Sequence, residues 1–188
     1  FFEKKIFKKK KIKKTYNIFF IGRFVESKDP IFFLKNVLKL KEKININVFI
    51  LGEGELLDEL KKISKNNKNI NFLKFTNNPF KKYHEKIDLL CVTSKFDGTP
   101  NVLGEAIAHS IPCVAPRNVG LANVLLKNGK GGYLYKQGNN RSFQEKVHYA
   151  LKNYKKTIQK SLVSYDELEN FSKENTLFKL DYQISKLN

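Results

Sequence analysis

Two kinds of segment alternate along this chain. One is a short run of apolar residues followed by glycine or polar residues. The other is a segment in which apolar residues recur at helical spacing. The first run, 17–22, ends in Gly22, and Asp29-Pro30 then opens a segment of helical periodicity. A second run, 44–51, is followed by another such segment. The later apolar runs span 70–75, 87–92, 111–115 and 131–135, and the later helical segments span 55–65, 80–86, 100–109, 121–127 and the tail from 139, interrupted near Asn170.

This alternation predicts an α/β fold, with a Rossmann-like parallel sheet and helices on both of its faces. The runs are apolar almost throughout, as expected of strands that are covered on both sides. A length of 188 residues suits one domain, and we expect a basic linker segment at 1–16 and the folded domain with its helical tail at 17–188. The chain contains no methionine, even at its first position, which indicates a piece or a processed product of a longer protein.

The formal net charge of +18 predicts contact with anions, and residues 1–14 contain eight lysines but only one acidic residue, Glu3. One interpretation of this tract is a solvated lysine-rich segment. The other is a polybasic segment that holds the protein at an anionic membrane surface, at about 1 kcal/mol per lysine. Nucleic acid is the less favoured partner, because no nucleic-acid-binding motif accompanies the lysines.

Cysteine and histidine usage excludes several kinds of site. Cys91 and Cys113 both lie in apolar runs, which predicts buried free thiols and a reducing compartment. His84, His109 and His148 lack metal-ligand spacing, so no metal site is expected. No apolar run reaches the ~18 residues of a membrane span, and no secretory signal pattern opens the chain. These features predict a cytoplasmic location, with peripheral contact at the inner face of a membrane as an additional interpretation.

Four segments with glycine or polar residues follow predicted strands. Because the carboxyl ends of parallel strands meet at one edge of a sheet, where open α/β sheets bind ligands, these segments are expected to converge. They are Gly22-Arg23, Gly52-Glu53, Thr76-Asn77 and Asp97-Gly98.

Each of the first three segments has two interpretations. Arg23 and Lys28 can clamp a diphosphate, since arginine supplies a planar fork of donors and lysine a point charge; the alternative is a pair of surface cations. Gly52-Glu53-Gly54 lacks the third glycine of the dinucleotide fingerprint and is interpreted mainly as a tight turn from strand to helix. Thr76-Asn77-Asn78 can bond the edge of a base, and a simple turn is equally favoured.

The stretch after the fourth strand combines a predicted helix start with two carboxylates. Thr99 is a good N-cap and Pro100 suits the first helical position. The free amides of residues 101–103 would then favour an anion. Asp97 and Glu105, on either side, can accept hydrogen bonds from sugar hydroxyls. A surface glutamate with a turn-stabilising aspartate explains the same residues equally well.

Residues 96–108, Phe-Asp-Gly-Thr-Pro-Asn-Val-Leu-Gly-Glu-Ala-Ile-Ala, resemble the signature of the retaining glycosyltransferases of family 4, which have the GT-B fold and typically show Glu-Gly-x-Pro-x-x-x-x-Glu-Ala here. Gly22-Arg23 with Lys28, the 52–54 turn and the runs at 111–115 and 131–135 match other landmarks of the family in order. The resemblance covers about 17–137. It implies the C-terminal, donor-binding half of a GT-B fold.

The resemblance also implies a role for each matching residue. Arg23, Lys28 and Asp97 would be the catalytic residues: the two cations hold the diphosphate of a UDP- or GDP-sugar, and Asp97 contacts the transferred sugar. Glu105 would accept hydrogen bonds from the ribose, and residues 75–77 would lie near the base. No metal or further cofactor is implied, because the cations neutralise the phosphates. The other residues of the implied site are Gly22, Phe75, Thr76, Gly98, Thr99, Pro100, Asn101, Val102 and Leu103.

The chain departs from the family pattern at two positions and lacks the family's second domain. Asp97 stands where the family usually has glutamate, and Asn123 where a glutamate often opens the helix after Gly120. The N-terminal acceptor-binding domain is missing. We therefore expect the donor-binding part of a hexosyltransferase that builds a surface glycan such as lipopolysaccharide or capsule. The alternative is a non-catalytic sugar-nucleotide-binding subunit that pairs with a separate acceptor-binding partner.

Overall fold

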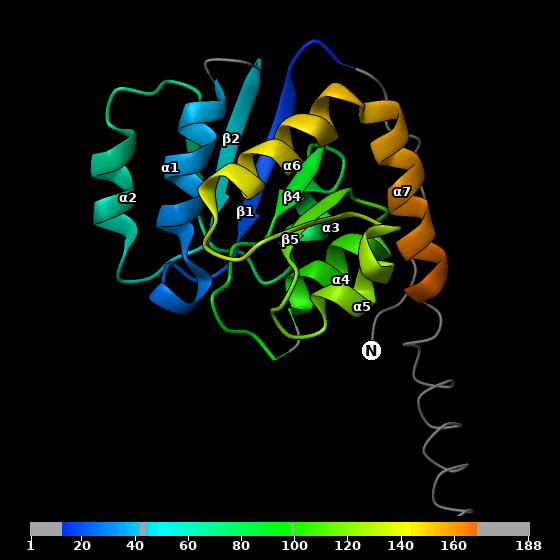
Figure 1. Ribbon diagram of the computed structural model, residues 1–188. Helices are drawn as coiled ribbons and strands as arrows, with labels where there is room; N and C mark the ends of the chain where they lie inside the picture. Colours follow the sequence, from blue (N-terminus) through cyan, green and yellow to red (C-terminus); the bar gives the residue numbers. More distant parts are fainter. Residues whose placement is uncertain (1–12, 42–43, 99, 169–188) are drawn as a thin grey trace, which may run out of the picture.

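The computed structural model describes residues 13–41, 44–98 and 100–168. Within them, six strands form one parallel sheet in the order β3-β2-β1-β4-β5-β6 (Figure 1). Each neighbouring pair is parallel, which confirms the predicted Rossmann-like sheet. The strands are β1 (Tyr16–Ile21), β2 (Ile46–Leu51), β3 (Ile70–Leu73), β4 (Leu89–Cys91), β5 (Cys113–Pro116) and β6 (Tyr133–Tyr135).

Helices cover both faces of the sheet, as predicted. One core lies between the sheet and helices α1, α2 and α6, and the other between the sheet and helices α3, α4 and α5. Helix α7 runs along the side of the molecule away from α2 (Figure 1). The α-helices are α1 (Pro30–Lys41), α2 (Leu57–Ser64), α3 (Pro79–Tyr83), α4 (Asn101–Ala108), α5 (Ala122–Leu125), α6 (Asn140–Lys152) and α7 (Tyr154–Glu167), and two 3₁₀ turns are η1 (Glu26–Lys28) and η2 (Lys127–Gly129).

Strand β1 illustrates why its sequence is apolar without alternation. Ile18 and Phe20 pack into the core on the α1 side, whereas Phe19 and Ile21 pack into the core on the α4 side. Side chains of a strand point alternately to opposite faces, so a strand buried on both faces has no solvent side on which to place polar residues.

The two cysteines are free and buried, as predicted, and lie in β4 and β5. Burial raises the pKa of both the Cys91 and the Cys113 thiol, which keeps them protonated. None of the helices described for this chain has the length and apolar character needed to span a bilayer.

The starts and ends of some elements differ from the prediction. Pro100 precedes α4 as its N-cap instead of occupying its first helical position. The helical tail has a break at Asn153, between α6 and α7, that was not predicted, and the predicted interruption near Asn170 lies outside the described residues. Asn153 leaves the helical conformation and its side-chain amide donates to the Tyr149 carbonyl oxygen at 3.1 Å. The Asn153 backbone amide donates to the same oxygen at 3.0 Å, so the last helical bond of α6 is kept. Hydrophobic periodicity does not reveal such a local side-chain contact.

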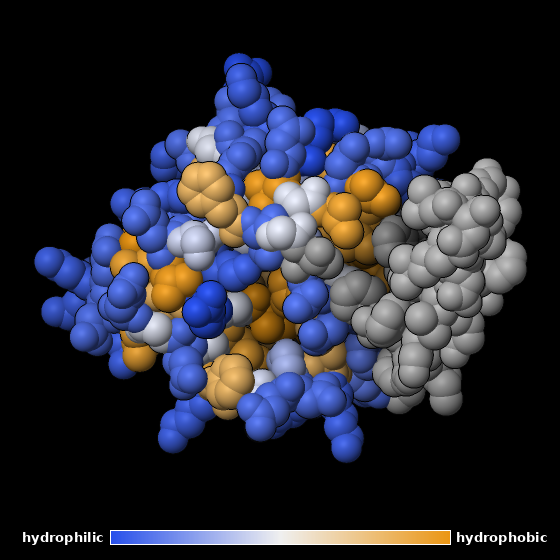
Figure 2. Space-filling model, turned by 90° about the horizontal axis from the view of Figure 1, so that it is seen from below, coloured by the Kyte–Doolittle hydropathy of each residue, from blue (hydrophilic) through white to orange (hydrophobic). Residues whose placement is uncertain are grey.

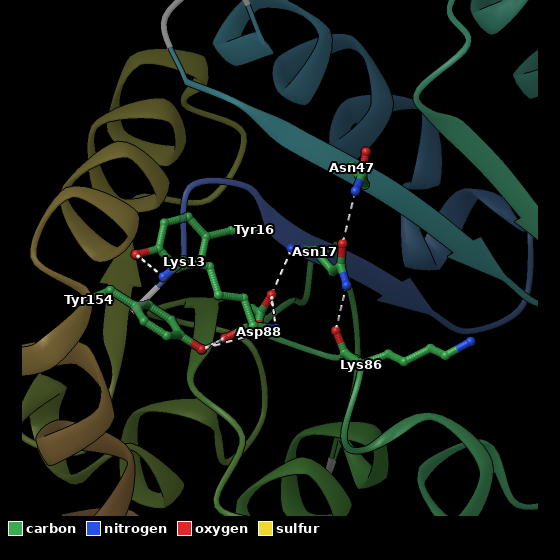
Figure 3. Close-up of polar contacts among 7 residues, drawn as sticks. All are labelled: Lys13, Tyr16, Asn17, Asn47, Lys86, Asp88 and Tyr154. Atoms are coloured by element: carbon green, nitrogen blue, oxygen red, sulfur yellow. Dashed lines mark hydrogen bonds and ion pairs between the residues drawn. The ribbon is translucent and has the colours of Figure 1, made fainter. Parts of the chain in front are cut away.

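At the amino end of the sheet, a buried carboxylate ties four segments together (Figure 3). Asp88 is fully buried and pairs with the Lys13 ammonium at 2.7 Å. It also accepts from the Asn17 backbone amide at 2.9 Å, and the Tyr154 hydroxyl donates to the Asp88 carbonyl oxygen at 3.0 Å. Most of the predicted basic segment, residues 1–12, lies outside the described residues. Its last part is anchored to the fold through Lys13.

Replacing Asp88 with asparagine is expected to lower the free energy of unfolding by about 1–3 kcal/mol, since this buried position loses its charge-assisted bonds to the Lys13 ammonium and the Asn17 amide. Urea unfolding should show a lower midpoint with an unchanged slope. The control is Asp166→Asn, at an exposed position in α7, which is expected to stay within about 0.5 kcal/mol. Equal stability of the two variants would contradict a stabilising role for the network.

Candidate functional site

Two adjoining cavities lie at the edge of the sheet where the strands end. The larger, of about 500 Å³, and the smaller, of about 140 Å³, share Ile21, Gly22 and Val102 as lining residues. They open where β1 lies between β2 and β4, the point at which the strand order reverses and open α/β sheets bind their ligands. Figure 2 looks onto this edge of the molecule and shows apolar side chains in a hollow ringed by hydrophilic ones.

The smaller cavity brings together two of the predicted site residues, Lys28 and Asp97. The Lys28 ammonium donates a hydrogen bond to the Asp97 carboxylate, with 25% of the lysine side chain and 12% of the aspartate side chain exposed. This ion pair is therefore partly withdrawn from solvent, which makes it less screened than a surface pair. Without a ligand, the cation predicted to hold phosphate is neutralised by the carboxylate predicted to contact the sugar.

Hydrogen bonds to backbone carbonyl oxygens join two loops and fix the position of this ion pair. The Thr93 hydroxyl lies 3.0 Å from the carbonyl oxygens of both Lys28 and Asp29, and the Lys95 amide donates to the Ser27 carbonyl oxygen at 2.8 Å. The segment that leaves β4 is thus attached to η1, which carries Lys28. Sequence reasoning missed Thr93. A hydroxyl directly after a buried strand is the signal that could have found it.

The start of α4 supplies the amides of this cavity, but fewer than predicted. Asn101 and Val102 line the cavity, and among the described residues neither amide has an acceptor. The amide of Leu103 is already bonded to the Pro100 carbonyl oxygen at 2.8 Å, so the prediction of three free amides is wrong at Leu103. The helix tightens at its first turn, as helix ends often do. Thr99, the predicted N-cap, lies outside the described residues.

The larger cavity holds four further predicted residues, whereas the predicted site residues Gly98, Pro100 and Leu103 line neither cavity. Arg23, Glu105, Phe75 and Thr76 all line it, and Arg23 and Phe75 are exposed. Partial withdrawal from water raises the pKa of the Glu105 carboxyl. Arg23 and Lys28 thus lie in adjoining cavities instead of one, with the shared residues Gly22 and Val102 between them.

The turn at Gly52-Glu53-Gly54 also lines the larger cavity, in line with the predicted convergence of the segments that follow the strands. Its interpretation as a tight turn fits the structure: Gly52 has φ +149°, and a Cβ atom there would lie 2.0 Å from the Gly22 carbonyl oxygen. The Phe24 amide donates to the Glu53 carbonyl oxygen at 2.7 Å. The backbones after β1 and β2 therefore pack directly on each other, and this contact shapes the wall of the cavity.

The loop after β5 packs against the backbone of Asp97 and Gly98. Gly120 has φ +50°, and a Cβ atom there would lie 2.2 Å from the Gly98 carbonyl oxygen and 2.4 Å from that of Asp97. Asn123, in α5, lines neither cavity, and its side-chain amide donates to the Asn128 side-chain oxygen at 2.6 Å.

Within the described ranges, no three His, Cys, Asp or Glu side chains gather as metal ligands would. The expectation of a site without metal stays a prediction.

Comparisons with known proteins place this site in a family context. The family model for glycosyl transferases group 1 matches residues 1–165. The GalNAc-alpha-(1->4)-GalNAc-alpha-(1->3)-diNAcBac-PP-undecaprenol alpha-1,4-N-acetyl-D-galactosaminyltransferase of Campylobacter jejuni is 31% identical over 120 residues, which are 62% of this chain and 33% of that protein. The O-antigen biosynthesis glycosyltransferase WbnH of Escherichia coli is 35% identical over 114 residues, 61% of this chain and 32% of that protein.

Solved structures share the fold. S. aureus TarM has a TM-score of 0.81 at 22% identity, over 92% of this chain and 36% of that one. Anabaena HepE, in complex with UDP and glucose, has a TM-score of 0.79 at 16% identity, over 92% of this chain and 49% of that one. The C-terminal domain of a group 1 glycosyl transferase (LpcC) from Francisella tularensis has a TM-score of 0.71 at 22% identity, over 80% of this chain and 83% of that one.

The chain thus spans about a third of the length of the curated relatives that it matches, and it corresponds in fold to a C-terminal domain within the GT-B architecture. The family match extends over most of the chain, from its first residue to within α7, and includes both cavities. This chain belongs to the glycosyl transferases of group 1.

Proposed function

We propose that this chain is the donor-binding domain of a retaining glycosyltransferase of family 4, which transfers a hexose-type sugar from a UDP- or GDP-sugar to a surface-glycan acceptor. The observation that carries the proposal is that the two cavities adjoin. Lys28, Asp97 and the start of α4 line one, and Arg23, Glu105 and Phe75 line the other, with Ile21, Gly22 and Val102 common to both.

In the proposal, one extended ligand lies across both adjoining cavities. The diphosphate binds at the junction, between Arg23, Lys28 and the start of α4, where cations and free amides both favour negative charge. The nucleoside occupies the larger cavity, with its ribose hydroxyls on Glu105 and its base beside residues 75–77. The sugar extends toward Asp97 in the smaller cavity. HepE, which has this fold, was crystallised with UDP and glucose, which supports a nucleotide of this class.

The chemistry of the proposal assigns one task to each charged group. As the bond between sugar and diphosphate breaks, negative charge grows on the leaving phosphate oxygen. In the proposal, Lys28, Arg23 and the amides of Asn101 and Val102 stabilise that charge. Asp97 holds the sugar by its hydroxyls, and the leaving phosphate assists removal of the acceptor's proton. The acceptor itself binds to a second domain. Relatives named for O-antigen biosynthesis support an acceptor of the surface-glycan class.

Titration calorimetry with UDP, GDP and their 2′-deoxy forms tests the placement of the nucleotide. We expect one ribonucleoside diphosphate to bind, and Glu105→Ala to weaken it roughly tenfold or more because a charged hydrogen bond to the ribose is lost. The same variant should affect the 2′-deoxy form less. Glu59→Ala, at an exposed position in α2, is the matched control and should change neither affinity. Absence of binding by either base at millimolar concentration would overturn the proposal.

A further inference from the structure

A third cavity, of about 540 Å³, lies between β6, α6 and α7 and shares no lining residue with the two cavities at the sheet edge. Four of its lining side chains are cationic and only one is a carboxylate, that of Glu145. The cations are Arg117, Lys146, Lys156 and Lys160. An excess of like charge around one hollow costs free energy unless an anion compensates it.

Lys160 is the most enclosed of these cations. Its ammonium donates to the Gly129 carbonyl oxygen and lies 5.3 Å from the centre of the Tyr133 ring. Partial burial lowers the pKa of Lys160, and the charges of Lys156 and Lys146 lower it further. The Lys160 ammonium therefore lies within the electrostatic influence of Lys156 and Lys146.

The carboxylate of the cavity does little to offset this charge. Glu145 accepts a hydrogen bond from Arg141, a cation of its own helix, at 2.8 Å. In the part of the chain that the structure describes, no ion pair joins Arg117, Lys146 or Lys156 to a carboxylate. These three exposed side chains are free to turn toward a ligand.

The positive charge continues beyond this cavity. A neighbouring cavity of about 410 Å³ at the corner between α6 and α7 shares Lys156 with it and is also lined by Lys152 and Lys155. Together the two cavities are lined by six cations from α6, α7 and the loop after β5. That charge exceeds what a single carboxylate can neutralise, and it suits a ligand with several anionic oxygens. A planar arginine fork beside flexible ammonium groups is the donor set typical of phosphate recognition.

We propose that the cavity between β6, α6 and α7 binds the phosphate group of an anionic ligand, at a site separate from that of the sugar-nucleotide donor. Arg117 and the exposed Lys146 and Lys156 hold the phosphate oxygens. Lys160, held by its bond to Gly129, contributes a positive charge from within the cavity. The phosphate belongs either to a free small molecule or to the headgroup of an anionic lipid. Both present the same chemistry to these side chains.

Backbone amide NMR of the full chain distinguishes this site from the donor site residue by residue. Inorganic pyrophosphate is expected to shift the amide signals of Gly132 and Leu134, which line the third cavity. In the double variant Lys146→Ala/Lys156→Ala, the pyrophosphate affinity measured from these shifts should fall at least about tenfold. Any shifts at Asn101 and Val102 should stay unchanged. The control variant Lys35→Ala/Lys61→Ala removes the same charge from exposed positions of α1 and α2 and should leave the affinity within about twofold.

Sedimentation with lipid vesicles separates the two sources of phosphate. If the ligand is a lipid headgroup, the chain should bind phosphatidylglycerol vesicles but not phosphatidylcholine vesicles, with the same loss in the Lys146→Ala/Lys156→Ala variant and not in its control. Binding of pyrophosphate alone would assign the site to a free phosphorylated molecule. The proposal is overturned if pyrophosphate leaves Gly132 and Leu134 unshifted and the two double variants bind anionic vesicles equally. Failure of nucleotide binding at the sheet edge would leave these results unaffected.

Discussion

Replacing Lys28 with alanine is expected to weaken the binding of a nucleoside diphosphate roughly 10- to 150-fold, the range that corresponds to losing a charged hydrogen bond of about 1.5–3 kcal/mol. The loss should be seen with the diphosphate and be at least as large with its sugar derivative, because both carry the phosphates that Lys28 contacts and Lys28 also holds Asp97, which is proposed to contact the sugar. Titration calorimetry of the variant with UDP and UDP-glucose, or with the GDP pair if that base binds, measures both affinities.

Two variants make this result specific. Asp97→Asn, which keeps the shape of the side chain, should weaken the sugar nucleotide but not the free diphosphate, since Asp97 is proposed to contact only the sugar. Lys62→Ala removes an exposed cation from α2 and controls for the change in net charge. An affinity of Lys28→Ala within about twofold of the unmodified chain would contradict the position of the diphosphate. In that case the Lys28–Asp97 pair would be structural.

The fold was largely predictable because its signals are local. The apolar run of β1 and the start of α1 at Pro30 follow from hydrophobic periodicity and from the backbone preference of proline. The order of the strands is not local. β1 lies between β2 and β4 because each crossover returns the chain to the sheet beside an existing strand, and no single segment of sequence encodes that choice.

Four charged residues of the candidate site, Arg23, Lys28, Asp97 and Glu105, were predicted, but their partners were not. Lys28 and Asp97 are 69 positions apart in the sequence, so their ion pair depends on how two loops are brought together by the sheet. The assignment of Arg23 and Lys28 to adjoining cavities depends on the same arrangement. Spacing along a chain can identify groups that suit a phosphate. It does not determine which of them neutralise one another in the absence of ligand.

Gly120 is a position whose importance appears only in three dimensions. Its backbone lies against the carbonyl oxygens of Asp97 and Gly98, and its positive φ would strain any side chain. Gly120→Ala is expected to cost about 1 kcal/mol for the backbone conformation and roughly 2 kcal/mol more for the overlap, which forces the Asp97 loop to move. Urea unfolding measures the total.

Gly138→Ala provides the matched control, because Gly138 also has a positive φ, of +69°, but no atom lies within 4 Å of a Cβ atom built there. The difference in stability between the two variants therefore isolates the overlap from the backbone strain. If the loop after β5 positions Asp97, Gly120→Ala should also reduce the preference for the sugar nucleotide over the free diphosphate, whereas Gly138→Ala should keep it. An unchanged preference in Gly120→Ala would separate the packing of this loop from sugar recognition, and Asp97 would then owe its position to Lys28 and η1 alone.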